Sequence, residues 1–153
     1  MALHEFHRRV EQQLAHPLAY PALPRRPHGQ VLLRVWQHPS FTPAACWALI
    51  RDGKQEVLRR IVVDVAPDPL WQPVSWGAER EVLPSEFADL MAQLRDLRFS
   101  PFQAREGFCL DGCEFGVDTS DFLAQSSLSW RNEPPETWQA LAQWHARAIT
   151  QFN

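Results

Sequence analysis

Cysteine and histidine side chains are the groups of this sequence whose spacing could support chemistry. Cys109 and Cys113 stand four positions apart, as in some redox and metal pairs, and Cys109 with His145 would make a nucleophile and its base. His4 and His7 lie one helical turn apart, which suits two metal ligands, but no third ligand stands at a recognisable distance from them. Each pairing depends on the secondary structure that positions it.

The cysteine pair falls on a predicted β-hairpin. The Asp111-Gly112 pair lies between alternating apolar residues, which is the strongest short-range hairpin pattern. With these two residues in the turn, one buried face consists of Phe108, Leu110, Cys113, Phe115 and Val117. Cys109 lies on the opposite face, so the two thiols point apart and a disulfide would require backbone movement. The pattern favours a buried Cys113 and an incidental Cys109.

Short catalytic and nucleotide-binding motifs are absent from the sequence. It contains no Gly-x-Gly-x-x-Gly, no P-loop, no Gly-x-Ser-x-Gly and no His-Glu-x-x-His. We therefore predict no catalytic residue, no metal site and no cofactor. The alternative is a small enzyme of unknown reaction, with Cys109 or a histidine in a cleft beneath residues 16–30.

Apolar periodicity predicts one α+β domain over residues 1–153, an antiparallel meander sheet with helices near the N-terminus, in the middle and at the C-terminus. Residues 16–30 form a connector, because their four prolines cannot join a helix interior or a central strand. Residues 66–83 are expected to be irregular for the same reason, and residues 118–121 to form a polar turn. The predicted order is α-β-β-β-α-β-β-β-α.

The individual elements follow from the same patterns. Helices are predicted at residues 3–14, 84–97 and 136–152, and strands at residues 31–37, 46–50, 56–65 and 126–130, besides the hairpin at 108–117. Asp52-Gly53 indicates a second hairpin, whose register the sequence leaves open. The closing helix presents an apolar stripe that includes Trp138, Leu141 and His145, and Trp144 falls off this stripe.

Charge is unevenly distributed along the chain. Residues 1–60 carry a net +5 and residues 61–153 a net −8, which leaves −3 overall. The extreme is segment 111–136, with six carboxylates against Arg131 alone. Such a segment is either a solvated face or a patch for a basic partner. Tryptophans in the irregular region either plug the core or anchor that partner. The predicted partner-binding residues are Trp71, Trp76, Glu114, Asp118, Asp121 and Glu133.

The same composition bounds the partners and the compartment. An acidic C-terminal two-thirds would repel phosphates, so we expect no nucleic acid partner. No apolar run is long enough to cross a bilayer, and we expect no membrane partner. Three cysteines without a framework pattern, and an N-terminus without the apolar core of a signal peptide, predict a cytoplasmic protein.

The chain from residue 87 onward carries a spaced set of structural motifs. They are Leu94, Leu97 and Ser100-Pro101, then Leu110-Asp111-Gly112, then Trp130, and finally Pro135-Glu136-Thr137-Trp138-Gln139-Ala140-Leu141. In this pattern the chain resembles a loose group of small, mostly uncharacterised bacterial α+β proteins, some of them immunity-protein-like. Immunity proteins bind and neutralise a toxin encoded beside them, so the resemblance implies an α+β fold and a protein partner.

The sequence therefore predicts a non-enzymatic, cytoplasmic protein-binding module. Its expected partner is a protein, in the immunity-like case a basic toxin. Besides the small-enzyme alternative, a homodimeric structural module paired through its sheet edge is a further alternative.

Overall fold

The computed structural model describes residues 3–64, 74–100, 112–121 and 124–153, without the side chains of residues 3, 4, 6 and 7. Several residues singled out by the sequence therefore lie outside the described part. They are Trp71, Cys109 and Asp111, together with the side chains of His4 and His7.

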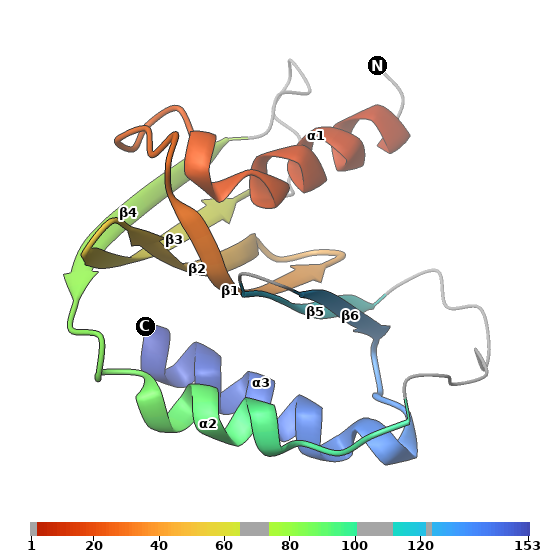
Figure 1. Ribbon diagram of the computed structural model, residues 1–153. Coiled ribbons are helices and arrows are strands. Elements are labelled where there is room, and N and C mark those ends of the chain that lie inside the picture. The colour runs from red at the N-terminus through yellow and green to blue at the C-terminus, as the bar shows by residue number, and fades with distance from the viewer. Residues whose placement is uncertain (1–2, 65–73, 101–111, 122–123) are drawn as a thin grey trace.

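Six strands form one antiparallel sheet in the order β4-β3-β2-β1-β5-β6 (Figure 1). The strands are β1 (Gln30–Pro39), β2 (Ala44–Asp52), β3 (Gln55–Val63), β4 (Ser75–Val82), β5 (Cys113–Ser120) and β6 (Gln125–Arg131). The helices are α1 (Leu3–Ala15), α2 (Ala88–Asp96) and α3 (Gln139–Phe152), with short 3-10 turns at η1 (Pro17–Ala19) and η2 (Glu136–Trp138). The predicted α+β class is confirmed.

The sheet separates two apolar cores. Helix α1 lies on one side of it, and α2 and α3 lie together on the other (Figure 1). Strand β2 lies inside the sheet and is buried on both faces from Ala44 to Ile50. Its even-numbered residues join Val10 and Leu14 of α1 in one core, and its odd-numbered residues join Leu90 and Leu141 in the other. A continuous apolar run is typical of a strand covered on both faces.

Helix α3 is buried more deeply than its periodicity predicts. Trp144, expected off the apolar stripe, has no exposed surface, and its Nε1 donates to the Leu90 carbonyl oxygen at 2.8 Å. The reason is that α3 contacts α2 as well as the sheet, so its buried face is wider than one stripe. Phe152 at its end meets Phe87 edge to face, with ring centroids 4.9 Å apart.

Residues 108–111 of the predicted hairpin at residues 108–117 lie outside the described part of the chain. The described half, Cys113 to Val117, lies in β5, which pairs with β1 on one side and with β6 on the other. Phe115, expected opposite Phe108, lies opposite Gln37 and Trp130. The expected polar turn at 118–121 is too early, because β5 continues to Ser120. The predicted strand at 126–130 is confirmed as β6.

The predicted irregular region contains a regular strand. Ser75–Val82 pairs with β3 along its whole length, so Trp76 lies in β4 and not in a loop. The described residues therefore run helix, four strands, helix, two strands, helix. The predicted hairpin between β2 and β3 is present, and its register is now defined. Asp52 lies opposite Gln55, which leaves Gly53 and Lys54 as the turn, with Gly53 at a φ of 63°.

Residues 16–29, which we call the strap, cover the α1 side of β3 and β4. Tyr20 of the strap is buried, and its hydroxyl lies 2.8 Å from Ser75 Oγ. Gly77 makes room for it, since a Cβ atom there would lie 2.8 Å from Tyr20 Cε1. The predicted proline-rich connector is thus packed against the sheet.

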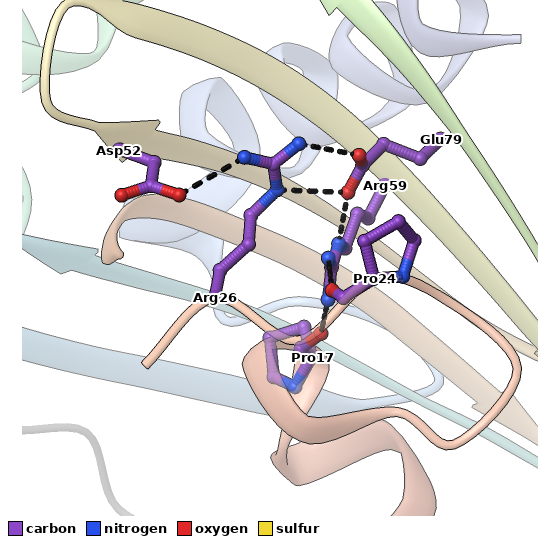
Figure 2. Close-up of polar contacts among 6 residues, drawn as sticks. All are labelled: Pro17, Pro24, Arg26, Asp52, Arg59 and Glu79. Atoms are coloured by element: carbon purple, nitrogen blue, oxygen red, sulfur yellow. Dashed lines mark hydrogen bonds and ion pairs between the residues drawn. The ribbon is translucent and has the colours of Figure 1, made fainter. Parts of the chain in front are cut away.

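A buried ion-pair network fastens the strap (Figure 2). Arg59 of β3 has no exposed surface; it donates to Glu79 of β4 and to two strap carbonyls, those of Pro17 and Pro24. Arg26 of the strap donates to both Glu79 oxygens, at 2.6 and 3.1 Å, and to Asp52 at 3.0 Å. The hydrogen bond from Arg26, together with that from Arg59, lowers the pKa of Glu79 despite partial burial. The hydrogen bond between Arg26 and Glu79 also raises the pKa of Arg26.

Replacing Glu79 should destabilise the fold. Glu79→Gln leaves the buried Arg59 without its anion, so we expect the free energy of unfolding at neutral pH to fall by about 3–5 kcal/mol. Because the folded pKa of Glu79 lies below its ordinary value of 4.5, its contribution is present above that pH and is lost as the pH falls through the folded value. Urea unfolding measures both effects.

The matched control is Glu81→Gln, an exposed carboxylate on the same strand. This variant should unfold close to wild type. Equal losses in the two variants would show that the network does not stabilise the strap.

Candidate functional site

The α1 side of the sheet carries an open, polar surface over β1, β5 and β6. Helix α1 packs mainly against β2 and β3, whereas the β6 side chains on this side are exposed. Leu33 and Val35 of β1 point into the α2–α3 core. Side chains alternate along a strand, so Arg34 and Trp36 point to the α1 side. We call this surface the Trp36 face, and it consists of Arg34, Trp36, His38, Glu114, Gly116, Asp118, Ser127, Ser129 and Arg131.

Trp36 lies flat on the backbone of the neighbouring strand. Gly116 is its directly opposite residue on β5, and a Cβ atom at Gly116 would lie 2.1 Å from Trp36 Cε2. Real Cβ atoms do not approach a ring so closely, so any other residue at position 116 would displace the indole. The glycine therefore serves a close approach and not a turn.

Asp118 fixes the indole and a neighbouring guanidinium. Its Oδ2 accepts from Arg34 Nε at 2.7 Å and from Trp36 Nε1 at 3.2 Å. Arg34 Nη1 also donates to the carbonyl oxygen of Leu14, in the last turn of α1, at 3.2 Å. The Arg34 and Asp118 side chains keep 21% and 22% of their surface exposed. The pair is therefore a structural clamp that remains reachable from solvent.

His145 of α3 contacts the backbone of Trp36 from the other side of the sheet. It is 2% exposed, and its Nε2 lies 3.0 Å from the carbonyl oxygen of Trp36, which can only accept the hydrogen bond. The imidazole packs edge to face against Phe115 and Trp130. Burial lowers the pKa of His145, and the hydrogen bond to Trp36 offsets only part of that effect.

Strand β6 supplies the outer part of the Trp36 face. Ser127 lies opposite Asp118 and Ser129 opposite Gly116, and both serines are exposed. At the end of the pair, Arg131 Nη2 lies 3.6 Å from Glu114 Oε2. The face therefore combines one fixed aromatic ring, two arginine–carboxylate pairs and free hydroxyl groups.

Five of the six predicted partner-binding residues lie in the described part of the chain, and two of these five share the Trp36 face. Glu114 and Asp118 lie four residues apart on β5, both on the Trp36 face, and both are ion-paired. Asp121 and Glu133 are exposed beyond the ends of β5 and β6. Trp76 is 50% exposed on β4, at the opposite edge of the sheet and on the α2–α3 side.

Sequence reasoning did not single out Arg34, Trp36 or Gly116. Side chains alternate along a strand, so the predicted strand at residues 31–37 puts Arg34 and Trp36 on one face, as the structure has them. The missing information was the pairing of β1 with β5, which joins residues about eighty positions apart. A glycine inside a strand pattern is the one local signal for such a close approach.

The described thiols are poorly placed for nucleophilic chemistry. Burial raises the pKa of Cys46 to about 12 and also raises the pKa of the half-buried Cys113. A thiol with a raised pKa remains protonated at neutral pH and reacts slowly. Within the described residues no group of three His, Cys, Asp or Glu side chains is placed to hold a metal ion.

A shallow cavity of about 360 Å³ lies between α1 and the strap. It is lined by Arg9, Gln12, Gln13, His16, Ala19, Tyr20 and Pro21. This is the place where the small-enzyme alternative expected a cleft with a histidine. The lining contains the imidazole of His16 but neither a thiol nor a carboxylate, and Arg9 is paired with Glu5 at 2.9 Å.

Comparisons with known proteins identify no relative of this chain. No family model, curated protein or solved structure matches the chain. In the described part of the chain, no helix is both long and apolar enough to span a membrane.

The buried imidazole makes stability pH-dependent. The folded pKa of His145 lies below its ordinary value of 6.5, so the unfolded chain binds the proton first. We expect the free energy of unfolding to be highest above pH 6.5 and to fall by up to about 1.4 kcal/mol per pH unit between that value and the folded pKa. Denaturant titrations across this range measure the slope.

His145→Gln should reduce that slope, because its amide can still donate to the Trp36 carbonyl but does not titrate. His28→Gln replaces an exposed strap histidine and should leave the slope as in wild type. An unchanged slope in His145→Gln would assign the pH dependence to other groups.

Proposed function

We propose that this chain is a non-enzymatic protein-binding module whose binding surface is the Trp36 face. The observation that supports this most is the clamped indole of Trp36, which packs against the edge of the α1 core and keeps part of its surface exposed beside the open β6 strand. Contacts from Gly116, Asp118 and His145 hold this one residue in place. Such an arrangement is more than the stability of a strand requires, and it suits recognition.

Residue type and rigidity both favour protein binding. Tryptophan and arginine are the residues most enriched among those that dominate binding energy at protein interfaces. Trp36 and Arg34 are already ordered by Asp118, so little conformational entropy is lost when a partner covers them. The exposed Ser127 and Ser129 hydroxyls beside the ring provide donors and acceptors for the rim of an interface.

The charge around the face favours a basic partner. The two arginines on it are each matched by a carboxylate. Asp121 and Glu133 are exposed beyond the ends of β5 and β6. These exposed carboxylates would attract a positively charged protein surface to the β5–β6 part of the sheet. The resemblance to immunity-like proteins implies a toxin as the partner, and a basic toxin fits this surface.

Removing the indole should weaken binding of the partner. In affinity capture from source cells followed by mass spectrometry, we expect the tagged wild-type chain to retain one stoichiometric protein after a moderate-salt wash. Trp36→Ala should weaken its binding by about 2 kcal/mol or more, about thirty-fold in Kd. Thermal unfolding of the variant checks that the fold is retained.

Trp76→Ala is the matched control, because it removes an exposed indole from the opposite edge of the sheet. It should retain the same protein. Capture of no stoichiometric protein by wild type, or equal loss in both variants, would refute the Trp36 face as the binding surface.

The carboxylates of Asp121 and Glu133 should affect the rate of association with the partner. Asp121→Lys with Glu133→Lys should slow association with the captured partner and weaken its salt dependence, with little change in dissociation. Trp36→Ala should instead speed dissociation. Surface plasmon resonance at several salt concentrations separates the two, and unchanged association in the lysine variant would argue against a basic partner.

A further inference from the structure

The edge of the sheet at β4 exposes an unusual share of the apolar surface. Among the described residues, four large apolar side chains are at least half exposed: Phe41, Val74, Trp76 and Leu83. Val74, Trp76 and Leu83 lie on β4 or directly at its ends, with exposed fractions of 53%, 50% and 71%. This concentration is distant from the Trp36 face, which lies towards the β6 edge.

Strand β4 also has a free hydrogen-bonding edge within the described part of the chain. It pairs with β3 on one side, and it ends the sheet on the other (Figure 1). An edge strand presents unpaired N–H and C=O groups that can pair with another strand. Natural edges are usually blocked by charged side chains, lysine above all, by proline or by a bulge. Residues 75–82 contain no lysine or proline, and the β3–β4 register is unbroken. Of their three charged residues, Glu79 is paired with Arg26 and Arg59, and Arg80 is paired with Glu86.

The two faces of β4 differ in a way that limits its partners. Ser75, Gly77 and Glu79 point to the α1 side, where the strap contacts all three. Trp76, Ala78 and Arg80 point to the other side, as does Val82, which is buried in the α2–α3 core. A strand added at this edge would cover the exposed flank of Trp76.

We propose that β4 pairs antiparallel with β4 of a second copy, forming a two-fold symmetric dimer with one continuous sheet. An axis perpendicular to the sheet keeps both α2–α3 faces on the same side. In this symmetry a residue can lie opposite its own copy, and the sequence favours Ala78 for that position. Trp76 then lies opposite Arg80 of the second copy. The Arg80 guanidinium is held by Glu86 at 2.7 Å and lies over the Phe87 ring, so the aliphatic part of the Arg80 side chain would cover the Trp76 ring.

The neighbouring registers are less favourable for electrostatic reasons. A shift that brings Glu79 opposite its own copy places two carboxylates against each other, and a shift to Arg80 does the same for two guanidinium groups. Like charges directly opposite each other destabilise a strand pair. Centring on Gly77 avoids this but pairs fewer residues of the strand. With Ala78 at the centre, Glu79 lies opposite Gly77 and Glu81 opposite Ser75, so no like charges meet.

The solution mass tests the dimer directly. Sedimentation equilibrium of the full chain should give twice the 17.7 kDa of one chain, falling to the single value on dilution. Ala78→Lys places two ammonium groups at the axis and should give the single mass at every concentration, since Ala78 is exposed and tolerates the longer side chain in one copy. Ser127→Lys on β6, the opposite edge strand, should keep the double mass.

A crosslink tests the register. Residues opposite each other in an antiparallel pair have Cα atoms about 4.5–5.5 Å apart, within the range of a disulfide. Mild oxidation of Ala78→Cys should therefore give a covalent dimer, whereas Glu81→Cys should not, because its copy lies near the other end of the strand pair. A wild-type chain of single mass at all concentrations, or a double mass that Ala78→Lys does not change, would overturn the proposal.

Discussion

The burial of one guanidinium group constrains much of this structure. Arg59 lies on a strand inside the sheet and has no exposed surface, so its charge and its donors must be satisfied within the protein. Three partners from two segments satisfy it: the carbonyl groups of Pro17 and Pro24 in the strap, and the carboxylate of Glu79 in β4. The cost of removing this charge from water is fully offset only when all three partners are in place. The strap and the outer strand are thereby fixed to each other as well as to β3.

The sequence predicted the elements whose patterns are local. Both amphipathic helices after residue 84, the first three strands and β6 lie where periodicity placed them, within a few residues. Strand β4 was missed because its pattern of Ser75, Gly77 and Glu79 against Trp76, Ala78 and Arg80 is only weakly apolar, and its pairing with β3 determines its structure. Propensity is a weak guide where tertiary pairing decides.

The hairpin predicted at residues 108–117 shows the same limit from another direction. Turn residues such as Asp111-Gly112 indicate where a chain can reverse, but not whether the flanking segments pair with each other. Strand β5 instead pairs with β1, far away in sequence. The Trp36 face depends on this non-local pairing, since Trp36 meets Gly116 and Asp118 only because β1 and β5 are neighbours. The exposed acidic residues were visible in the sequence; the ring of Trp36 was not identifiable as part of a site.

Two glycines on the α1 side of the sheet set a limit on how this chain can vary. Gly77 lies beneath Tyr20 at one end of the sheet, and Gly116 lies beneath Trp36 at the other. Neither has the positive φ of a turn glycine, and in each case the neighbouring ring occupies the space of a side chain. Gly53, which does have a positive φ, has open space around it. Gly77 and Tyr20, and likewise Gly116 and Trp36, can therefore be substituted only together. Each strand glycine must be retained for as long as its aromatic ring is retained.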